Sequence, residues 1–120
     1  MINDFYDLNA WKEGHKLVLH IYKITKTFPK NEQYALTDQI QRAVTSITAN
    51  IAEGFGRYHY ADKIRFYHLA RGSIKEVQNF IIVAKDLEYL KEGVFTKIWA
   101  QSKVSEKLIN GLIRSANNQK

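Results

Sequence analysis

Polar side chains recur at helical spacing along the stretch from Gln39 to Arg57. They carry hydroxyl, amide, carboxylate and guanidinium groups, and they are Arg42, Ser46, Asn50, Glu53 and Arg57. Spacings of three and four residues place them on one face of a helix, where such groups could bind a ligand or a neighbouring helix. An apolar stripe, which we expect to be buried, runs about 100° away around the same helix. Polar groups this close to a core need specific partners, because unpaired buried polar atoms cost free energy.

The sequence leaves three partners open for this polar face. One is a structural network that sets helix register, as buried polar residues do in coiled coils. We favour this network and expect its members to be Arg42, Ser46, Asn50, Glu53, Ser73 and Glu76. The second is a ligand or nucleic acid held by Arg42 and Arg57, and the third is another subunit.

A second group mixes basic and aromatic residues just after this stretch, from Arg57 to Arg71. Arginine and lysine neutralise phosphates, and tyrosine stacks on unpaired bases. The candidate nucleic-acid-binding residues are Arg57, Lys63, Arg65 and Arg71. The same composition is typical of a solvated loop followed by an exposed helix face, and on the local sequence alone we favour that interpretation.

Catalytic and metal-binding patterns are missing from the sequence. His15 and His20 are five residues apart and His59 and His68 are nine apart, so neither pair has the i, i+4 spacing of metal ligands on one helix. The segment Gly54–Gly56 follows a helical pattern rather than a strand, which argues against a phosphate-binding loop. We therefore expect no catalytic residue, no metal and no cofactor, and a binding protein rather than an enzyme.

Composition indicates one helical domain, residues 1–120, with a basic surface. The formal net charge of +6 favours polyanionic partners such as nucleic acid or the acidic face of a protein. One proline and six glycines leave few turns for an all-β fold. The absence of cysteine, of a signal-peptide pattern and of a long apolar run leads us to expect a cytoplasmic protein without membrane contact.

Hydrophobic periodicity predicts an all-α fold, an antiparallel up-down-up-down four-helix bundle. The expected helices span about residues 8–27, 36–55, 62–91 and 94–117. Asp7 is the expected N-cap of the first helix, Gly54 and Gly56 are expected to end the second, and Gly93 separates the last two. In the third helix we expect Leu69 and Leu87 on the inner side, and Gly72 at a close approach of a neighbouring helix.

Several motifs resemble a known family, the four-helix bundle proteins encoded in intervening sequences of bacterial 23S ribosomal RNA genes. The motifs are Phe5-x-x-Leu8-x-x-Trp11, Phe28-Pro29, Gln39-Ile40-x-Arg42-Ala43, Ser46-Ile47, Asn50-Ile51-Ala52-Glu53-Gly54-x-Gly56-Arg57, Arg65-Phe66, Ala70-x-Gly72-Ser73 and Glu76. They cover nearly the whole chain, and Val44 is a minor departure from the usual Arg-Ala-Ala segment.

This resemblance implies a left-handed up-and-down bundle that assembles as a ring, with a homopentamer as the expected state. A related branch, the accessory protein of diversity-generating retroelements, binds nucleic acid and partners a reverse transcriptase. Our leading hypothesis is therefore a non-enzymatic homo-oligomer that binds RNA or a nucleoprotein. The alternative is a protein-interaction or scaffold module that meets an acidic protein partner without contacting nucleic acid.

Overall fold

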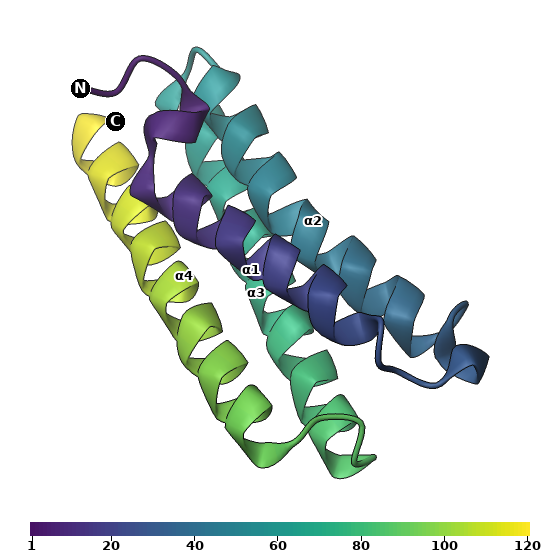
Figure 1. The fold of residues 1–120 in the computed structure, drawn as a ribbon. Helices are drawn as coiled ribbons and strands as arrows, with labels where there is room; N and C mark the ends of the chain where they lie inside the picture. Colours follow the sequence, from purple (N-terminus) through teal and green to yellow (C-terminus); the bar gives the residue numbers. More distant parts are fainter.

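Four α-helices and two 3₁₀ turns make up the fold, and no residue lies in a β-strand, which confirms the all-α prediction. The computed structural model describes residues 1–120. The helices are α1 (Asn9–Thr25), α2 (Leu36–Gly56), α3 (Tyr60–Asp86) and α4 (Glu92–Gln119), as Figure 1 shows. The 3₁₀ turns, Phe5–Asp7 and Lys30–Glu32, precede α1 and α2.

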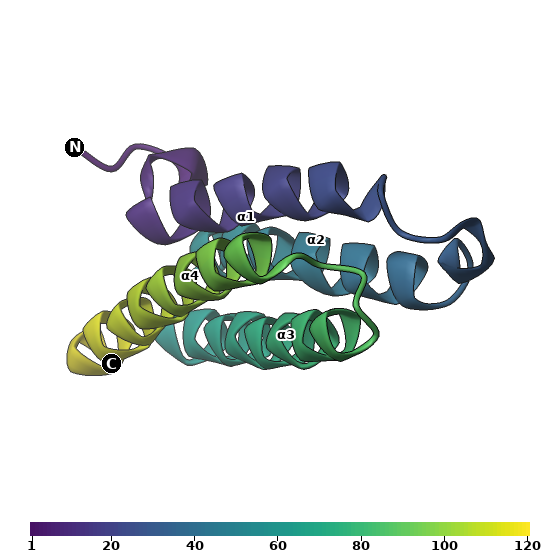
Figure 2. The ribbon, with the colours of Figure 1, turned by 60° about the horizontal axis from the view of Figure 1, so that its bottom comes forward.

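The helices pack side by side as a bundle. α1 packs on α2 and α4, and α3 packs on the same two helices from the other side, so that α1 and α3 lie apart in Figure 2. Both chain ends lie at the end of the bundle that also holds the α2–α3 connection (Figure 1). None of the four helices combines the length and hydrophobicity needed to span a lipid bilayer.

A core rich in isoleucine fills the space between the helices. Its largest fully buried side chains come from all four helices, with Ile21 from α1, Ile47 from α2, Ile74 from α3 and Ile109 from α4. The apolar stripe predicted for α2 is buried along its whole length, at Leu36, Ile40, Val44, Ile47 and Ile51. Each such side chain contributes about 1.5–3 kcal/mol of burial free energy, so this stripe anchors α2.

The start of α1 differs from the prediction. Asp7 does not cap the helix, because its Oδ2 accepts hydrogen bonds from the backbone N–H groups of Asn3 (3.0 Å) and Asp4 (3.1 Å). These bonds close the first 3₁₀ turn, and α1 begins at Asn9 after the extended residue Leu8. At its other end α1 stops at Thr25, before the expected residue 27.

α2 ends at Gly56, as expected, but neither Gly54 nor Gly56 adopts the left-handed conformation of a glycine C-cap. No glycine has a positive φ, and α2 continues through Gly56 to an extended Arg57 (φ −79°, ψ 145°). Gly54 instead lets α3 come close, because a Cβ there would lie 2.7 Å from Cε1 of Tyr67. The close approach expected at Gly72 is absent, since a Cβ at that position would meet nothing within 4 Å.

The third helix ends at Asp86 rather than at the expected residue 91. Glu88 adopts the left-handed conformation (φ 65°) and breaks the helix. The N–H of Tyr89 donates to the carbonyl of Ala84 (2.8 Å), and that of Glu88 donates to the carbonyl of Lys85 (2.9 Å). This pair of bonds is the Schellman motif, which usually places glycine where Glu88 stands.

Glu88→Gly should raise the free energy of unfolding by about 1 kcal/mol, because glycine adopts positive φ without the steric cost that a Cβ adds. Urea denaturation measures this change directly. The control is Glu76→Gly, the same substitution at an exposed position inside α3, which should lower stability by about 1 kcal/mol. Destabilisation by both substitutions would contradict the left-handed conformation at Glu88.

The inner face of α3 also differs from the prediction at two positions. Leu69 is 48 % exposed and Leu87 is 50 % exposed, although both were expected inside. The rest of the expected face is largely buried, and Tyr67, Ile74 and Gln78 are buried beside it. The expected residues that are buried are Ile64, Ala70, Ser73, Val77, Ile81 and Ala84. Leu69 and Leu87 border the buried face in the helical repeat, so periodicity alone did not show that α2 and α4 leave these two residues uncovered.

The end of the bundle away from the termini is held together by aromatic residues. The hydroxyl of Tyr89, in the α3–α4 connection, donates to Oε2 of Glu32 in the α1–α2 connection (2.8 Å). The rings of Tyr89 and Phe28 are also in contact, with centroids 5.5 Å apart. The two connections are thus joined although Glu32 and Tyr89 are 57 residues apart in the sequence.

Candidate nucleic-acid interface

Three of the polar residues singled out in the sequence form a small hydrogen-bonded group, in which one bond crosses from α3 to α2. The hydroxyl of Ser73 donates to Oγ of Ser46 (2.9 Å). Nδ2 of Asn50 donates to the carbonyl of Ser46 (2.8 Å) and to its Oγ (3.0 Å). The Ser73–Ser46 bond joins the two helices at one register, and the Asn50 side chain supports it from within α2.

The charged residues expected beside them lie elsewhere. Arg42 pairs with Asp38 one turn earlier on α2 (2.9 Å), on a surface where the arginine side chain is 79 % exposed. Glu53 pairs with Arg57 (3.2 Å). Glu76 is exposed and forms no ion pair, because it lies on the outer side of α3. Arg42, Glu53 and Glu76 are therefore surface residues outside the α2–α3 hydrogen bonds.

Lys63, a candidate phosphate contact, binds the end of α2 instead. Its Nζ donates to the carbonyl of Phe55 (2.6 Å) and reaches the carbonyl of Gly54 (3.5 Å). Carbonyls in the last turn of a helix lack an i+4 partner, although that of Gly54 also accepts the N–H of Arg57 (3.2 Å), and a lysine at a helix C-terminus complements the helix dipole. Burial lowers the pKa of the Lys63 ammonium. Its role is to stabilise the α2–α3 corner.

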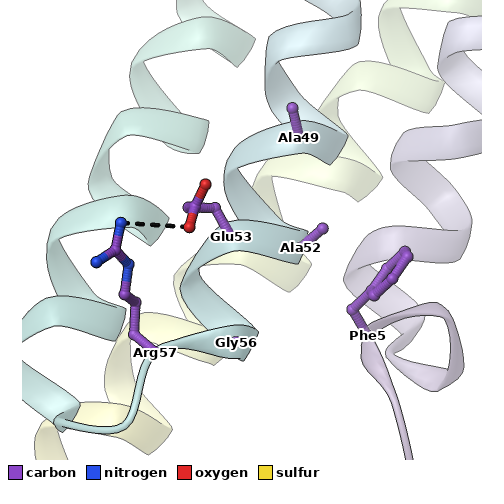
Figure 3. Close-up of a pocket in the computed structure, with 6 residues that line it drawn as sticks. All are labelled: Phe5, Ala49, Ala52, Glu53, Gly56 and Arg57. Atoms are coloured by element: carbon purple, nitrogen blue, oxygen red, sulfur yellow. Dashed lines mark ion pairs between the residues drawn. The ribbon is translucent and has the colours of Figure 1, made fainter.

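Arg57 and Arg65 lie over the same aromatic ring. Each guanidinium carbon is 4.7 Å from the centroid of Phe66, a distance typical of cation–π contacts. Beside Arg57 is an open hollow of about 550 Å³, lined also by Phe5 and Gly56. In Figure 3, Arg57 and Glu53 point to each other on the side of α2 away from Phe5. In this hollow the charge of Arg57 is thus neutralised by Glu53. Arg65 forms no ion pair and is the cation at this corner that a ligand can reach more readily.

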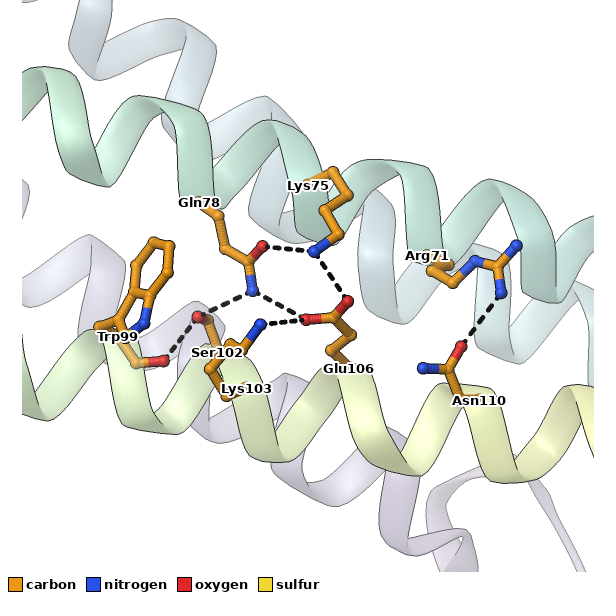
Figure 4. A network of polar contacts seen from close by, with 8 residues as sticks. All are labelled: Arg71, Lys75, Gln78, Trp99, Ser102, Lys103, Glu106 and Asn110. Carbon is orange, nitrogen blue, oxygen red and sulfur yellow. Dashed lines mark hydrogen bonds and ion pairs between the residues drawn. The ribbon is translucent and has the colours of Figure 1, made fainter.

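Arg71 is directed away from this corner, toward α4. Its NH1 group donates to Oδ1 of Asn110 (3.1 Å), and its NH2 group contacts Nδ1 of His68 (3.0 Å). Figure 4 shows that this contact continues a row of polar residues between α3 and α4. We call this row the basic seam and define it by its five cations, Arg71, Lys75, Lys103, Lys107 and Arg114.

One carboxylate lies within the basic seam. Glu106 is 14 % exposed, and its Oε2 pairs with Nζ of Lys75 (2.8 Å) while its Oε1 pairs with Nζ of Lys103 (3.3 Å). The buried amide of Gln78 also donates to Oε1 (3.1 Å) (Figure 4). Burial alone would raise the pKa of Glu106, but the hydrogen bonds from Lys75, Gln78 and Lys103 outweigh it and lower the pKa to about 2. Glu106 is therefore ionised at neutral pH.

The remaining cations of the basic seam are free for a ligand. Lys107 and Arg114 form no ion pair, and both line a shallow hollow of about 310 Å³ with Asn110. Sequence reasoning overlooked them, although residues 103, 107, 110 and 114 follow the spacing of one helical face. Only the packing of α4 on α3 reveals that this face continues the row begun by Arg71.

No group of histidine, aspartate or glutamate side chains in the structure could hold a metal ion. The histidines have other contacts: His15 stacks on Trp11 with centroids 4.7 Å apart, and Nδ1 of His20 lies 2.8 Å from Oε1 of Gln101. The geometry thus offers cationic surface and hydrogen-bond donors, which suits the recognition of an anion.

Comparison with protein families matches residues 6–111 to the model of the 23S rRNA-intervening sequence protein. The chain belongs to this family. Among solved structures, the intervening-sequence protein is similar to a crystal structure, at 1.70 Å resolution, of a protein of unknown function from the S23 ribosomal protein family of Bacteroides thetaiotaomicron VPI-5482. The two share 25 % sequence identity with a TM-score of 0.79, over 87 % of this chain and 97 % of the other. A search of curated proteins found no significant match.

Proposed function

We propose that this intervening-sequence protein is a non-enzymatic RNA-binding protein that contacts phosphates along the basic seam. The observation that supports it is the arrangement of five cations from α3 and α4 around a single carboxylate. Two of these lysines neutralise Glu106, which leaves Arg71, Lys107 and Arg114 without a carboxylate partner. Free arginine and lysine side chains are the groups that bind nucleic-acid backbones most strongly.

The dimensions of the basic seam fit a nucleic-acid strand. Lys103 and Arg114 are eleven residues apart on α4, which corresponds to roughly 16 Å along the helix axis, a length over which one strand carries several phosphates. The corner that holds Arg57 and Arg65 can extend this surface, because Tyr58 beside it is 88 % exposed and can stack on an unpaired base. Lys63 contributes by holding that corner in place.

We further propose that the protein acts as an antiparallel bundle assembled into a ring, with the homopentamer as the expected state. Support comes from apolar side chains at the end of α3 and just after it, where Ile82, Val83 and Leu87 are exposed in the single chain. Exposed apolar groups that lie close together are typical of surfaces that another protein covers. Placing the termini and the α2–α3 connection at one end of the bundle fits the antiparallel order (Figure 1).

A filter-binding titration against fragmented ribosomal RNA tests the proposed contact. The variant Lys107→Gln/Arg114→Gln should bind about tenfold more weakly at low salt. Its slope of log K against log salt should be shallower by about 1.4–1.8, since each phosphate contact contributes about 0.7–0.9. The matched control is Lys12→Gln/Lys26→Gln, which removes one exposed cation of α1 and one just after it and should bind as the wild type does.

Two results would contradict the proposal. Equal losses in the two double variants would mean that only net charge matters, and binding that is absent at low salt or unaffected by salt would exclude phosphate recognition. Native masses of all three proteins must agree, so that altered assembly does not imitate altered binding. A protein partner whose capture survives nuclease treatment would instead favour the scaffold alternative.

A further inference from the structure

A second cavity, separate from the basic seam, opens on the side of α4 that faces α1. Its volume is about 690 Å³, and its lining comes from the second half of α1, from the α3–α4 connection and from the first turns of α4. Small-molecule sites in proteins typically have volumes of 300–1,000 Å³. The cavity is thus large enough for a ligand of metabolite size.

The base of this cavity is apolar and well fixed. Ile24 is 8 % exposed and Leu90 is 7 % exposed, so both belong to the core, and Val94 continues the apolar surface. Tyr89 forms part of the wall, where its hydrogen bond to Glu32 and its contact with Phe28 hold it. A base made of core residues does not have to rearrange when a ligand binds, which lowers the cost of binding.

The rim of the cavity is cationic. Lys23 of α1, Lys91 of the connection and Lys97 of α4 all line it, and none of them forms an ion pair. Glu88 is the single carboxylate in the lining, so lysines outnumber it three to one. Like charges brought together around an apolar base repel one another, and a bound anion would relieve that repulsion.

We propose that this cavity binds a small organic anion, with an apolar body on the core residues and an anionic group at the lysine rim. A bare inorganic anion would leave the apolar base exposed to water. A neutral apolar molecule would leave the three lysines without a partner. Only a molecule with both parts covers the apolar base and pairs with the lysines of the rim. Its anionic group can be a carboxylate, a sulfonate or a phosphate ester. This site does not depend on RNA binding.

The probe for the experiment is 8-anilinonaphthalene-1-sulfonate, whose fluorescence rises when its aromatic body leaves water. We expect saturable binding with one site per chain. The uncharged analogue N-phenyl-1-naphthylamine should bind several-fold more weakly, and phenyl phosphate should displace the probe at lower concentration than inorganic phosphate does. Equal binding of the charged and neutral probes, or equal displacement by the two phosphates, would overturn the proposal.

Two double variants test whether the probe binds in the cavity. Lys23→Met/Lys97→Met should weaken probe binding by about four- to twenty-fivefold, since each exposed charge contributes about two- to fivefold. The matched control, Lys12→Met/Lys107→Met, changes the same two helices by the same charge outside the cavity and should bind the probe as the wild type does. Equal binding by the two double variants would exclude the cavity as the site.

A third variant separates weaker probe binding from loss of the folded structure. Lys91→Met changes an exposed residue before α4 and should weaken probe binding by about two- to fivefold while the melting temperature stays unchanged.

RNA binding by Lys23→Met/Lys97→Met should match that of the wild type. Unchanged probe binding in that variant would refute the cavity assignment alone, whereas loss of its RNA binding would count against the basic seam as the interface.

Discussion

Replacing Gly54 by alanine should lower the free energy of unfolding by about 1–2 kcal/mol, the cost of overpacking less the gain in helix propensity. In most helices this substitution stabilises, because alanine has the higher helix propensity by about 1 kcal/mol. Here the new Cβ would lie 2.7 Å from Cε1 of Tyr67 and 3.0 Å from Cβ of Phe66. Tyr67 is only 4 % exposed and cannot move aside, so α2 and α3 must separate. Overpacking of this kind typically costs 1–3 kcal/mol.

The matched control is Gly72→Ala, at an exposed position inside α3 where a Cβ would meet nothing within 4 Å. This variant should gain about 0.5–1 kcal/mol, which reflects propensity alone. Urea denaturation of both variants beside the wild type gives the two changes with opposite signs. A Gly54→Ala protein as stable as Gly72→Ala would show that α2 and α3 are farther apart at this point than the structure places them.

Glu106→Ala should lower the free energy of unfolding by about 2 kcal/mol. The substitution removes the acceptor shared by Lys75, Lys103 and the buried Gln78 amide, and an unsatisfied buried donor costs about 1–3 kcal/mol. The control Glu76→Ala removes an exposed, unpaired carboxylate from the facing helix and should change stability by less than about 0.5 kcal/mol. Equal small effects would mean that the Glu106 contacts contribute nothing.

The same residue makes stability depend on pH. The pKa of Glu106 is about 2 in the folded protein and 4.5 without the fold, so folding favours the ionised carboxylate. Its stabilising contribution is complete above about pH 5 and is lost as the pH falls toward 2. After allowance for solvent screening this contribution is about 1–2 kcal/mol. Stability of the wild type and of Glu106→Gln should therefore converge between pH 7 and pH 2, and a constant difference would contradict the lowered pKa.

Glu106→Ala also separates stability from binding. Removing the carboxylate frees Lys75 and Lys103 and makes the basic seam more positive, so the less stable protein should bind RNA more tightly. Filter binding at a temperature well below the melting transition measures this effect. Weaker RNA binding by a folded Glu106→Ala protein would argue against the basic seam as the interface.

The sequence predicted the helices well, because each has a regular apolar stripe between clear breaks. It misjudged the end of α3, since nothing in the residue type of Glu88 signals a left-handed conformation. It placed most of the inner face of α3 correctly but misjudged Leu69 and Leu87, which are exposed although they resemble buried residues in sequence. Side-chain chemistry alone does not say how far around α3 the neighbouring helices reach.

The candidate site was harder to predict than the fold. Arg57, Lys63, Arg65 and Arg71 are close in sequence, but the structure divides them between two surfaces and the end of α2. Lys63 binds carbonyl groups whose availability depends on where α2 ends. The basic seam needs both α3 and α4, which are joined only by tertiary packing, so no local pattern reveals it.

The contact between Tyr89 and Glu32 has a consequence for thermodynamic linkage. Tyr89 is at once the tie between the two helix connections and part of the wall of the lysine-rimmed cavity. A molecule that binds against this wall favours the tied state over any state in which the connections have come apart. By mass action it would stabilise that end of the bundle by RT ln(1 + [L]/Kd), or roughly 2.7 kcal/mol at a hundredfold excess over Kd. A ligand in this small cavity would thus stabilise both helix connections, although they are far apart in the chain.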